Sequence, residues 1–103
     1  MKLQPAIDSY LRHVSVERGL AANTIAAYRR DLALYAAWCD QQGIEDPASV
    51  DQSALSAFVQ YLGTREESPL TASSIARVLS SVRGFHRFLA EEGVTATDVA
   101  RET

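Results

Sequence analysis

The stretch "SSIARVLSSVRGFHRFL", residues 73–89, carries apolar side chains at the spacing of one helix face. With successive residues about 100° apart, this face consists of Ile75, Val78, Leu79, Val82, Phe85, His86 and Leu89. The remaining positions include Arg77, Arg83 and Arg87 but no carboxylate. The stretch therefore predicts an amphipathic helix with one buried side and one cationic side.

Three further segments show the same helical period, and no segment alternates like a strand for more than a few residues. Asn23 and Asp51 are the expected N-caps of the second and third helices. The sequence thus predicts a single all-α domain over residues 1–103, a four-helix orthogonal bundle of two helical hairpins, the first helix with the second and the third with the fourth. The helices are expected at about 3–18, 23–42, 51–64 and 72–92, with a tail at 94–103.

Composition fits one ordinary globular domain, with 47% hydrophobic and 22% charged residues in a chain of 103. No segment is apolar enough to span a membrane, and the start of the chain lacks the apolar core of a signal peptide. The single cysteine, Cys39, cannot form an internal disulfide. We therefore expect a cytoplasmic protein with no membrane contact.

The formal net charge of −3 is unevenly distributed along the chain. Residues 40–67 hold six of the thirteen acidic side chains but only one of the ten basic ones, which leaves nine bases against seven acids elsewhere. The negative charge is therefore largely separated from the second and fourth predicted helices, which carry the paired and spaced arginines. This separation makes a local polyanion-binding surface compatible with an acidic chain.

The outer face of the fourth predicted helix carries Ser73, Arg77, Ser80, Gly84 and Arg87. A solvated face is one interpretation. A polyanion partner is the other, because like charges four residues apart are slightly unfavourable and a mid-helix glycine costs about 1 kcal/mol relative to alanine. Guanidinium groups bind phosphate well, small hydroxyls can donate to it, and a bare glycine allows close approach. From the residues alone the two interpretations are equally favoured.

The segments "NTIAAYRRDL" (23–32) and "ARVLSSVRGFHRFL" (76–89), in this order and at this spacing, resemble the amino-terminal, core-binding domain of Xer-type tyrosine recombinases and related phage integrases. The resemblance extends from Leu3 to about Ala100. The tail departs from the family pattern, because Thr97-Asp98 stands where Asn-Pro is often found.

The resemblance implies a SAM-like four-helix domain whose second and fourth helices cross near the major groove of a DNA half-site. A separate carboxy-terminal domain, which would follow this chain, closes the clamp and carries the tyrosine that forms a 3′-phosphotyrosyl link. The implied partners are double-stranded DNA, that catalytic domain and sister recombinase subunits in a DNA-bound tetramer, whereas the isolated chain is expected to be a monomer. The positions carried over as DNA contacts are Asn23, Thr24, Arg29, Arg30, Ser73, Ser74, Arg77, Ser80, Ser81, Gly84 and Arg87.

Other chemistry is sparse, so the chain by itself is not expected to be an enzyme or to hold a metal or other cofactor. His13 and His86 are interpreted as hydrogen-bonded core or boundary residues, and Cys39 as an inert core thiol. Trp38 is expected to pack inside the domain. The alternative function is a helical protein-interaction module, in which the alanine-rich outer face of the second helix and Trp38 dock a partner and the arginines are only solvated.

Overall fold

A computed structural model describes residues 1–101 of the chain. Within this range it contains helices and no strand, so the predicted all-α class is confirmed. The elements in chain order are α1 (Leu3–Arg12), the π-helical turn η1 (His13–Glu17), α2 (Ala22–Gln41), the short 3-10 turn η2 (Pro47–Ser49), α3 (Gln52–Thr64) and α4 (Ala72–Glu91).

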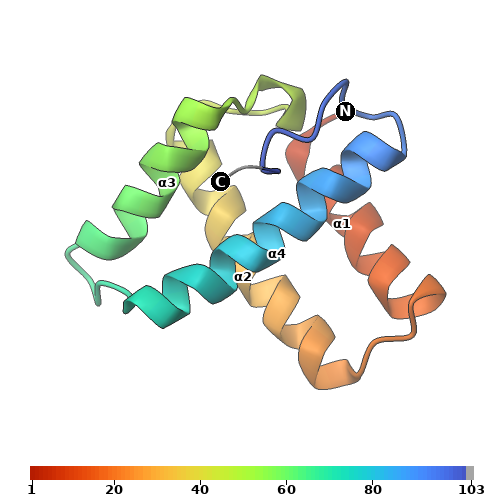
Figure 1. Cartoon of the computed structure of the whole chain (residues 1–103), viewed down its shortest axis with the longest axis horizontal. Helices are drawn as coiled ribbons and strands as arrows, with labels where there is room; N and C mark the ends of the chain where they lie inside the picture. Colours follow the sequence, from red (N-terminus) through yellow and green to blue (C-terminus); the bar gives the residue numbers. More distant parts are fainter. Residues whose placement is uncertain (102–103) are drawn as a thin grey trace.

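The helices form two hairpins, α1 with α2 and α3 with α4, as predicted. In Figure 1, α2 and α4 cross each other near their middles, and these two helices are in contact. α1 also packs on α4, which closes the bundle from a third side. The crossing of α2 and α4 is therefore the centre of the fold.

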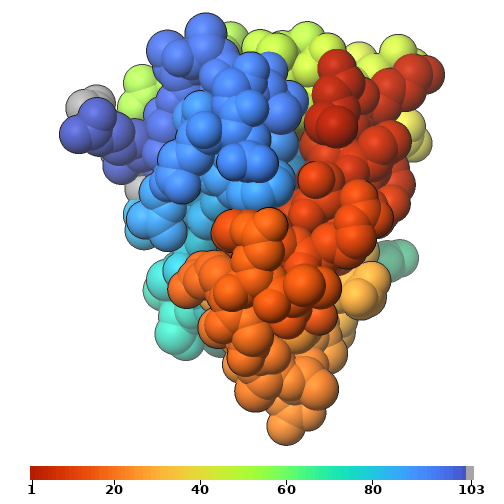
Figure 2. All heavy atoms as spheres, turned by 90° about the vertical axis from the view of Figure 1, so that its right-hand side faces the viewer, coloured from red at the N-terminus to blue at the C-terminus, as the bar shows by residue number. Residues whose placement is uncertain are grey.

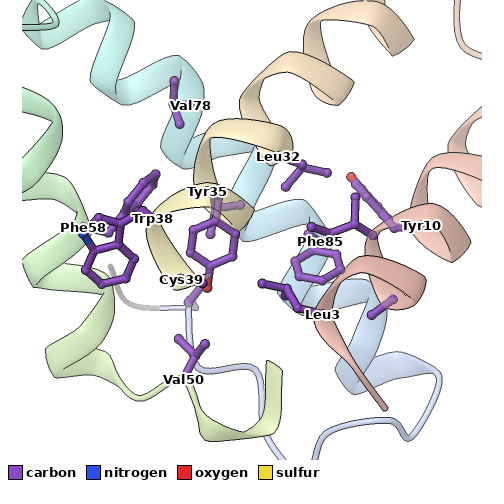
Figure 3. Packing of buried hydrophobic residues seen from close by; sticks show 14 of the residues in the cluster. Leu3, Tyr10, Leu32, Tyr35, Trp38, Cys39, Val50, Phe58, Val78 and Phe85 are labelled. Atoms are coloured by element: carbon purple, nitrogen blue, oxygen red, sulfur yellow. The ribbon is translucent and has the colours of Figure 1, made fainter. Parts of the chain in front are cut away.

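The core lies around this crossing, as Figure 3 shows. Tyr35 of α2 is fully buried and packs edge-on against Phe58 of α3 and Phe85 of α4, at ring-centroid distances of 5.1 and 6.5 Å. Trp38 is buried against Phe58 with the ring centroids 5.3 Å apart, which confirms that it packs inside the domain. Cys39 is also fully buried, as expected of a core thiol.

The helix starts differ in how they are capped. Asp51 accepts a hydrogen bond from the Ala54 amide at 2.7 Å, which confirms its predicted role as N-cap of α3. The prediction of Asn23 as N-cap of α2 is wrong: α2 begins at Ala22, and the extended residue Ala21 precedes it. A cap residue needs non-helical backbone angles, and the helix has already started at Ala22, a strong helix former.

The first helix is not regular over the predicted range 3–18. The α-helical pattern ends at Arg12, and a wider turn follows in which the Arg18 amide donates to the His13 carbonyl at 3.2 Å. This π-helical turn brings the His13 ring to 4.8 Å from that of Phe88 while Val14 stays fully buried. His13 also pairs with Glu17 at 2.6 Å, so it is a boundary residue as predicted.

The tail turns back onto the bundle after α4. Gly93 adopts a left-handed backbone conformation with φ 74°, and the Val94 amide donates to the Leu89 carbonyl at 2.9 Å, which closes the helix end. Ala100 is fully buried in the core. The predicted tail at 94–103 is thus packed against the domain up to residue 101, and its last two positions lie outside the described residues.

Gly84 has a packing role that the sequence did not reveal. Figure 2 shows the C-terminal half of α4, in blue, lying directly beside the red and orange residues of α1 and η1. A Cβ atom at position 84 would approach the hydroxyl of Tyr10, a buried residue of α1, to 2.5 Å. The glycine is therefore explained by the close approach of α1, and a polyanion partner is not needed to account for it.

We expect Gly84→Ala to destabilise the domain by about 1 kcal/mol, because the overpacking cost of about 1–3 kcal/mol outweighs the helix-propensity gain of up to about 1 kcal/mol. Removing the Tyr10 hydroxyl, which causes the clash, should reverse the sign of the stability change caused by Gly84→Ala. In a Tyr10→Phe background, Gly84→Ala should be neutral or stabilising when measured by urea denaturation. The same cost in both backgrounds would contradict the Tyr10 contact as its cause.

Because His86 is buried, we expect the stability of the domain to depend on pH. Its Nε2 lies 2.8 Å from the Tyr35 hydroxyl, and burial lowers the pKa of His86 to about 4 although the carboxylate of Asp98 acts in the opposite direction. Between about pH 6.5 and 4 the unfolded chain binds a proton that the folded chain does not, so the free energy of unfolding should fall with decreasing pH by about 3 kcal/mol in total.

The matched control is His86→Asn, which retains hydrogen-bonding capacity toward Tyr35 but does not titrate. Urea denaturation at several pH values should show a clearly weaker dependence in this variant across the same window. An unchanged slope would assign the effect to other groups.

Candidate nucleic-acid interface

A buried carboxylate, Asp31 of α2, sits where α2 meets α4. It is only 3% exposed, and both of its oxygens are engaged by α4. Nη1 of Arg77 lies 3.2 Å from Oδ1, and the Ser81 hydroxyl donates to Oδ2 at 2.8 Å. We call these three residues the Asp31 bridge.

The bridge corrects the prediction for Ser81. Ser81 was expected to face DNA, but it is 2% exposed and its hydroxyl is directed to Asp31. Ser80, one residue earlier and about 100° away around the helix, is exposed. Of the two adjacent serines, only Ser80 is available to a ligand.

The bridge also changes the interpretation of Arg77. Residues 71–90 contain no carboxylate, so this segment alone predicts arginines without an acidic partner. In the structure, Asp31 of α2 is the partner of Arg77, and the sequence of α4 alone could not indicate this contact. Arg77 is still 52% exposed, and a guanidinium has five N–H donors, so one carboxylate contact does not exhaust its capacity.

The outer side of α4 presents a cationic surface with contributions from the tail. A hollow of about 510 Å³ is lined by Ser80, Arg83, Gly84, Arg87, Asp98, Ala100 and Arg101. Arg83 and Arg87 come from α4, whereas Arg101 comes from the tail and is not among the DNA contacts predicted from the sequence. The position of Arg101 depends on a tertiary feature, the burial of its neighbour Ala100, which the sequence pattern does not indicate.

The two arginines of α2 differ in their surroundings. Arg29 lines a hollow of about 300 Å³ with Asp8, Leu11, Arg12 and Ser15, so it lies on the α1 side of α2. Arg30 is exposed and directly precedes the bridging Asp31. The structure therefore does not bring Arg29 together with the α4 residues of the predicted site, and Arg30 is the better candidate.

The two helix starts in the predicted site also differ. Asn23 and Thr24 are exposed in the first turn of α2, where no side chain caps the helix. At the start of α4, Thr71 accepts from the Ser74 amide at 3.2 Å and donates to the Ser74 hydroxyl at 3.1 Å. Ser74 thus already serves a capping network, whereas Ser73 is exposed and its hydroxyl lies 3.4 Å from that of Thr71.

No other chemistry gathers in the described part of the chain. It contains no cluster of His, Cys, Asp or Glu side chains suited to a metal ion and no helix long and apolar enough to cross a membrane. Burial raises the pKa of the Cys39 thiol to about 11 and raises the pKa of the Tyr10 and Tyr35 hydroxyls. These groups are therefore protonated at neutral pH and poorly suited to act as nucleophiles.

The family pattern and the relatives that match this chain agree with one another. The sequence pattern of the family described as "Phage integrase, N-terminal SAM-like domain" matches residues 7–93. The chain is 43% identical over 99 residues to tyrosine recombinase XerD of Mycobacterium tuberculosis, covering 92% of this chain and 32% of the relative. Its identity to XerD of Mycobacterium leprae is 42%, covering 96% and 33%, and to tyrosine recombinase XerC of Xanthomonas campestris 39%, covering 92% and 29%. The chain thus spans about a third of the length of these relatives.

The two serines provide a test of the bridge. Ser81→Ala should destabilise the domain by about 1–3 kcal/mol, because a buried carboxylate oxygen loses its donor. Ser80→Ala is the matched control and should change stability by no more than about 0.5 kcal/mol, because Ser80 is exposed. Urea denaturation of both variants measures the difference, and equal effects would contradict the asymmetry between the two serines.

Proposed function

Because this chain belongs to the phage integrase N-terminal SAM-like domain family, we propose that it binds duplex DNA through the crossed helices α2 and α4. The observation that carries the proposal is the α2–α4 crossing, where Arg77 is held by Asp31 yet half exposed. Arg30, which precedes Asp31 in the sequence, and Arg87, further along α4 than Arg77, are exposed arginines on the same two helices. We call Arg30, Arg77, Arg87 and Ser80 the proposed contact set.

The chemistry of the contact set suits a phosphate backbone. Guanidinium groups bind phosphate oxygens through directed N–H donors, and an exposed serine hydroxyl can add a neutral donor. Contacts of this kind position a protein on the duplex and carry little sequence information. The uncapped first turn of α2, with Asn23 and Thr24, offers further backbone donors to an anion.

The family supports a larger proposal for the protein to which this chain corresponds. The relatives are named tyrosine recombinases and are about three times as long as this chain. We infer that this segment is the non-catalytic half of a DNA clamp, and that a C-terminal domain would cleave and rejoin strands through a phosphotyrosine. Sister subunits assembled on DNA would then be the protein partners.

The alternative, a protein-interaction module, loses one of its two supports. Trp38 is 5% exposed and packs against Phe58, so it does not form part of a docking surface. Ala33 and Ala37 of α2 are exposed and line a hollow of about 470 Å³ with the start of α1. The residues that line this hollow do not include any of the contact set.

The test is binding of the 103-residue chain to a fluorescein-labelled duplex about three helical turns long, followed by fluorescence anisotropy. With three to five phosphate contacts, the log–log salt slope should be about −3 to −5, and affinity should fall about 60- to 1,000-fold between about 50 and 200 mM salt. At physiological salt the dissociation constant should be about 10⁻⁴ to 10⁻⁶ M. No binding at either salt concentration would favour the protein-interaction module.

Charge reversals locate the surface within the same experiment. Arg30→Glu and Arg87→Glu should each weaken binding and reduce the magnitude of the salt slope by about one. Arg77→Glu is less informative, because it would place a second carboxylate beside Asp31. Lys2→Glu is the matched control, since Lys2 is exposed in the hollow that also contains Asp40 and Glu45. Equal losses of affinity in Arg30→Glu, Arg87→Glu and Lys2→Glu would mean that overall charge, and not the crossed helices, determines binding.

A further inference from the structure

We propose that Asp31 is a positioning residue for DNA binding: an acidic side chain that strengthens binding to a polyanion because it orients Arg77. This inference rests on the proposed function and concerns the same surface. It is unexpected on charge alone, because a carboxylate close to phosphates should weaken their binding. The geometry of the Asp31 bridge instead supports a favourable effect of Asp31 on DNA affinity.

The first support is the burial of Asp31. Buried carboxylates are unfavourable unless they are paired and hydrogen-bonded, and Asp31 meets both conditions through Arg77 at 3.2 Å and Ser81 at 2.8 Å. Its side chain is 4% exposed, whereas that of Arg77 is 52% exposed. The pair therefore presents its positive end to solvent and its negative end to the protein interior.

The second support is that an ion pair formed by a buried carboxylate adds little to stability. Replacing such a pair by apolar side chains of similar volume is often neutral or stabilising, so fold stability alone does not require a carboxylate at this crossing. Orientation of the Arg77 guanidinium for a ligand, by contrast, does require a carboxylate beside it. The serine on the same helix as Arg77 fixes the second carboxylate oxygen, which leaves Oδ1 of Asp31 directed at the guanidinium.

The third support is the entropy of a long side chain. A free arginine loses roughly 2 kcal/mol of rotamer freedom when it is immobilised, and a side chain that is already held loses less on binding. Arg77 is held at one terminal nitrogen, and its other donors stay available to a ligand. Asp31 thus prepares Arg77 for phosphate before DNA arrives.

The repulsion between Asp31 and DNA is small by comparison. The negative charge is buried and neutralised by a guanidinium in direct contact, so a phosphate outside meets a dipole whose positive end is nearer. When Arg77 is absent, this shielding disappears and only the repulsion remains. The effect of Asp31 on DNA affinity should therefore change sign with the identity of residue 77.

The experiment is a double-mutant cycle in the duplex-binding assay at low salt, with circular dichroism to confirm that every variant is folded. Asp31→Asn keeps the shape of the side chain but removes the charge-assisted contact, and affinity should fall about three- to tenfold. In an Arg77→Ala background, Asp31→Asn should leave affinity unchanged or increase it. The matched control is Asp40→Asn, which removes an exposed acid from the same helix and should not weaken binding.

A second readout does not depend on DNA. In the free chain, NMR relaxation of the guanidinium Nε–H groups should show Arg77 more rigid than Arg87, and Asp31→Asn should remove the difference. Equal mobility of the two arginines in the parent chain, or an Asp31→Asn chain that binds DNA as well as the parent, would overturn the positioning role alone. A parent chain that does not bind the duplex would overturn the proposed function, and the role of Asp31 in DNA binding with it.

Discussion

Two polar bridges buried in an otherwise apolar crossing fix the register of α2 against α4. Asp31 meets Arg77 and Ser81, and Tyr35, four residues after Asp31, shares a hydrogen bond with His86, five residues after Ser81. A slip of one helix against the other would leave these groups without partners, and each buried unsatisfied group costs about 1–3 kcal/mol, more when it is charged. Apolar contacts alone would tolerate such a slip better, so the polar bridges specify a single arrangement.

This fixed register determines which side chains reach solvent. Asp31 is directed to α4, so Arg30, one residue earlier and about 100° around the helix, is exposed. The same relation holds on α4, where Ser81 is buried and Ser80 is exposed. In both helices a residue that fixes the crossing stands next to a residue available to a ligand. The proposed DNA surface is thus a direct consequence of the packing beneath it.

The helices and most of the core were predictable because the helical period is a local property of the chain. Two of the errors, those at Ser81 and Gly84, concern residues whose environment is set by another helix. Ser81 was carried over from the family resemblance as a DNA contact, but its hydroxyl is directed to Asp31 of α2. Gly84 was placed on the proposed DNA-contacting face because the approach of Tyr10 from α1 is a tertiary contact that the helix pattern does not contain. The pairing of Arg77 with Asp31 joins residues far apart in sequence. A pattern along one segment contains no information about such contacts.

The acidic character of the chain is consistent with the proposed role once affinity and specificity are separated. A strongly cationic domain would bind any polyanion, since contacts to phosphate are independent of sequence. With only a few arginines the isolated domain is expected to bind DNA weakly, and linkage to a second DNA-binding domain would raise overall affinity through effective concentration. In that setting oriented arginines are more useful than numerous mobile ones, because orientation reduces the entropy lost on binding a correctly placed phosphate. A carboxylate buried beneath Arg77 provides this orientation, and it does so without adding positive charge to the surface.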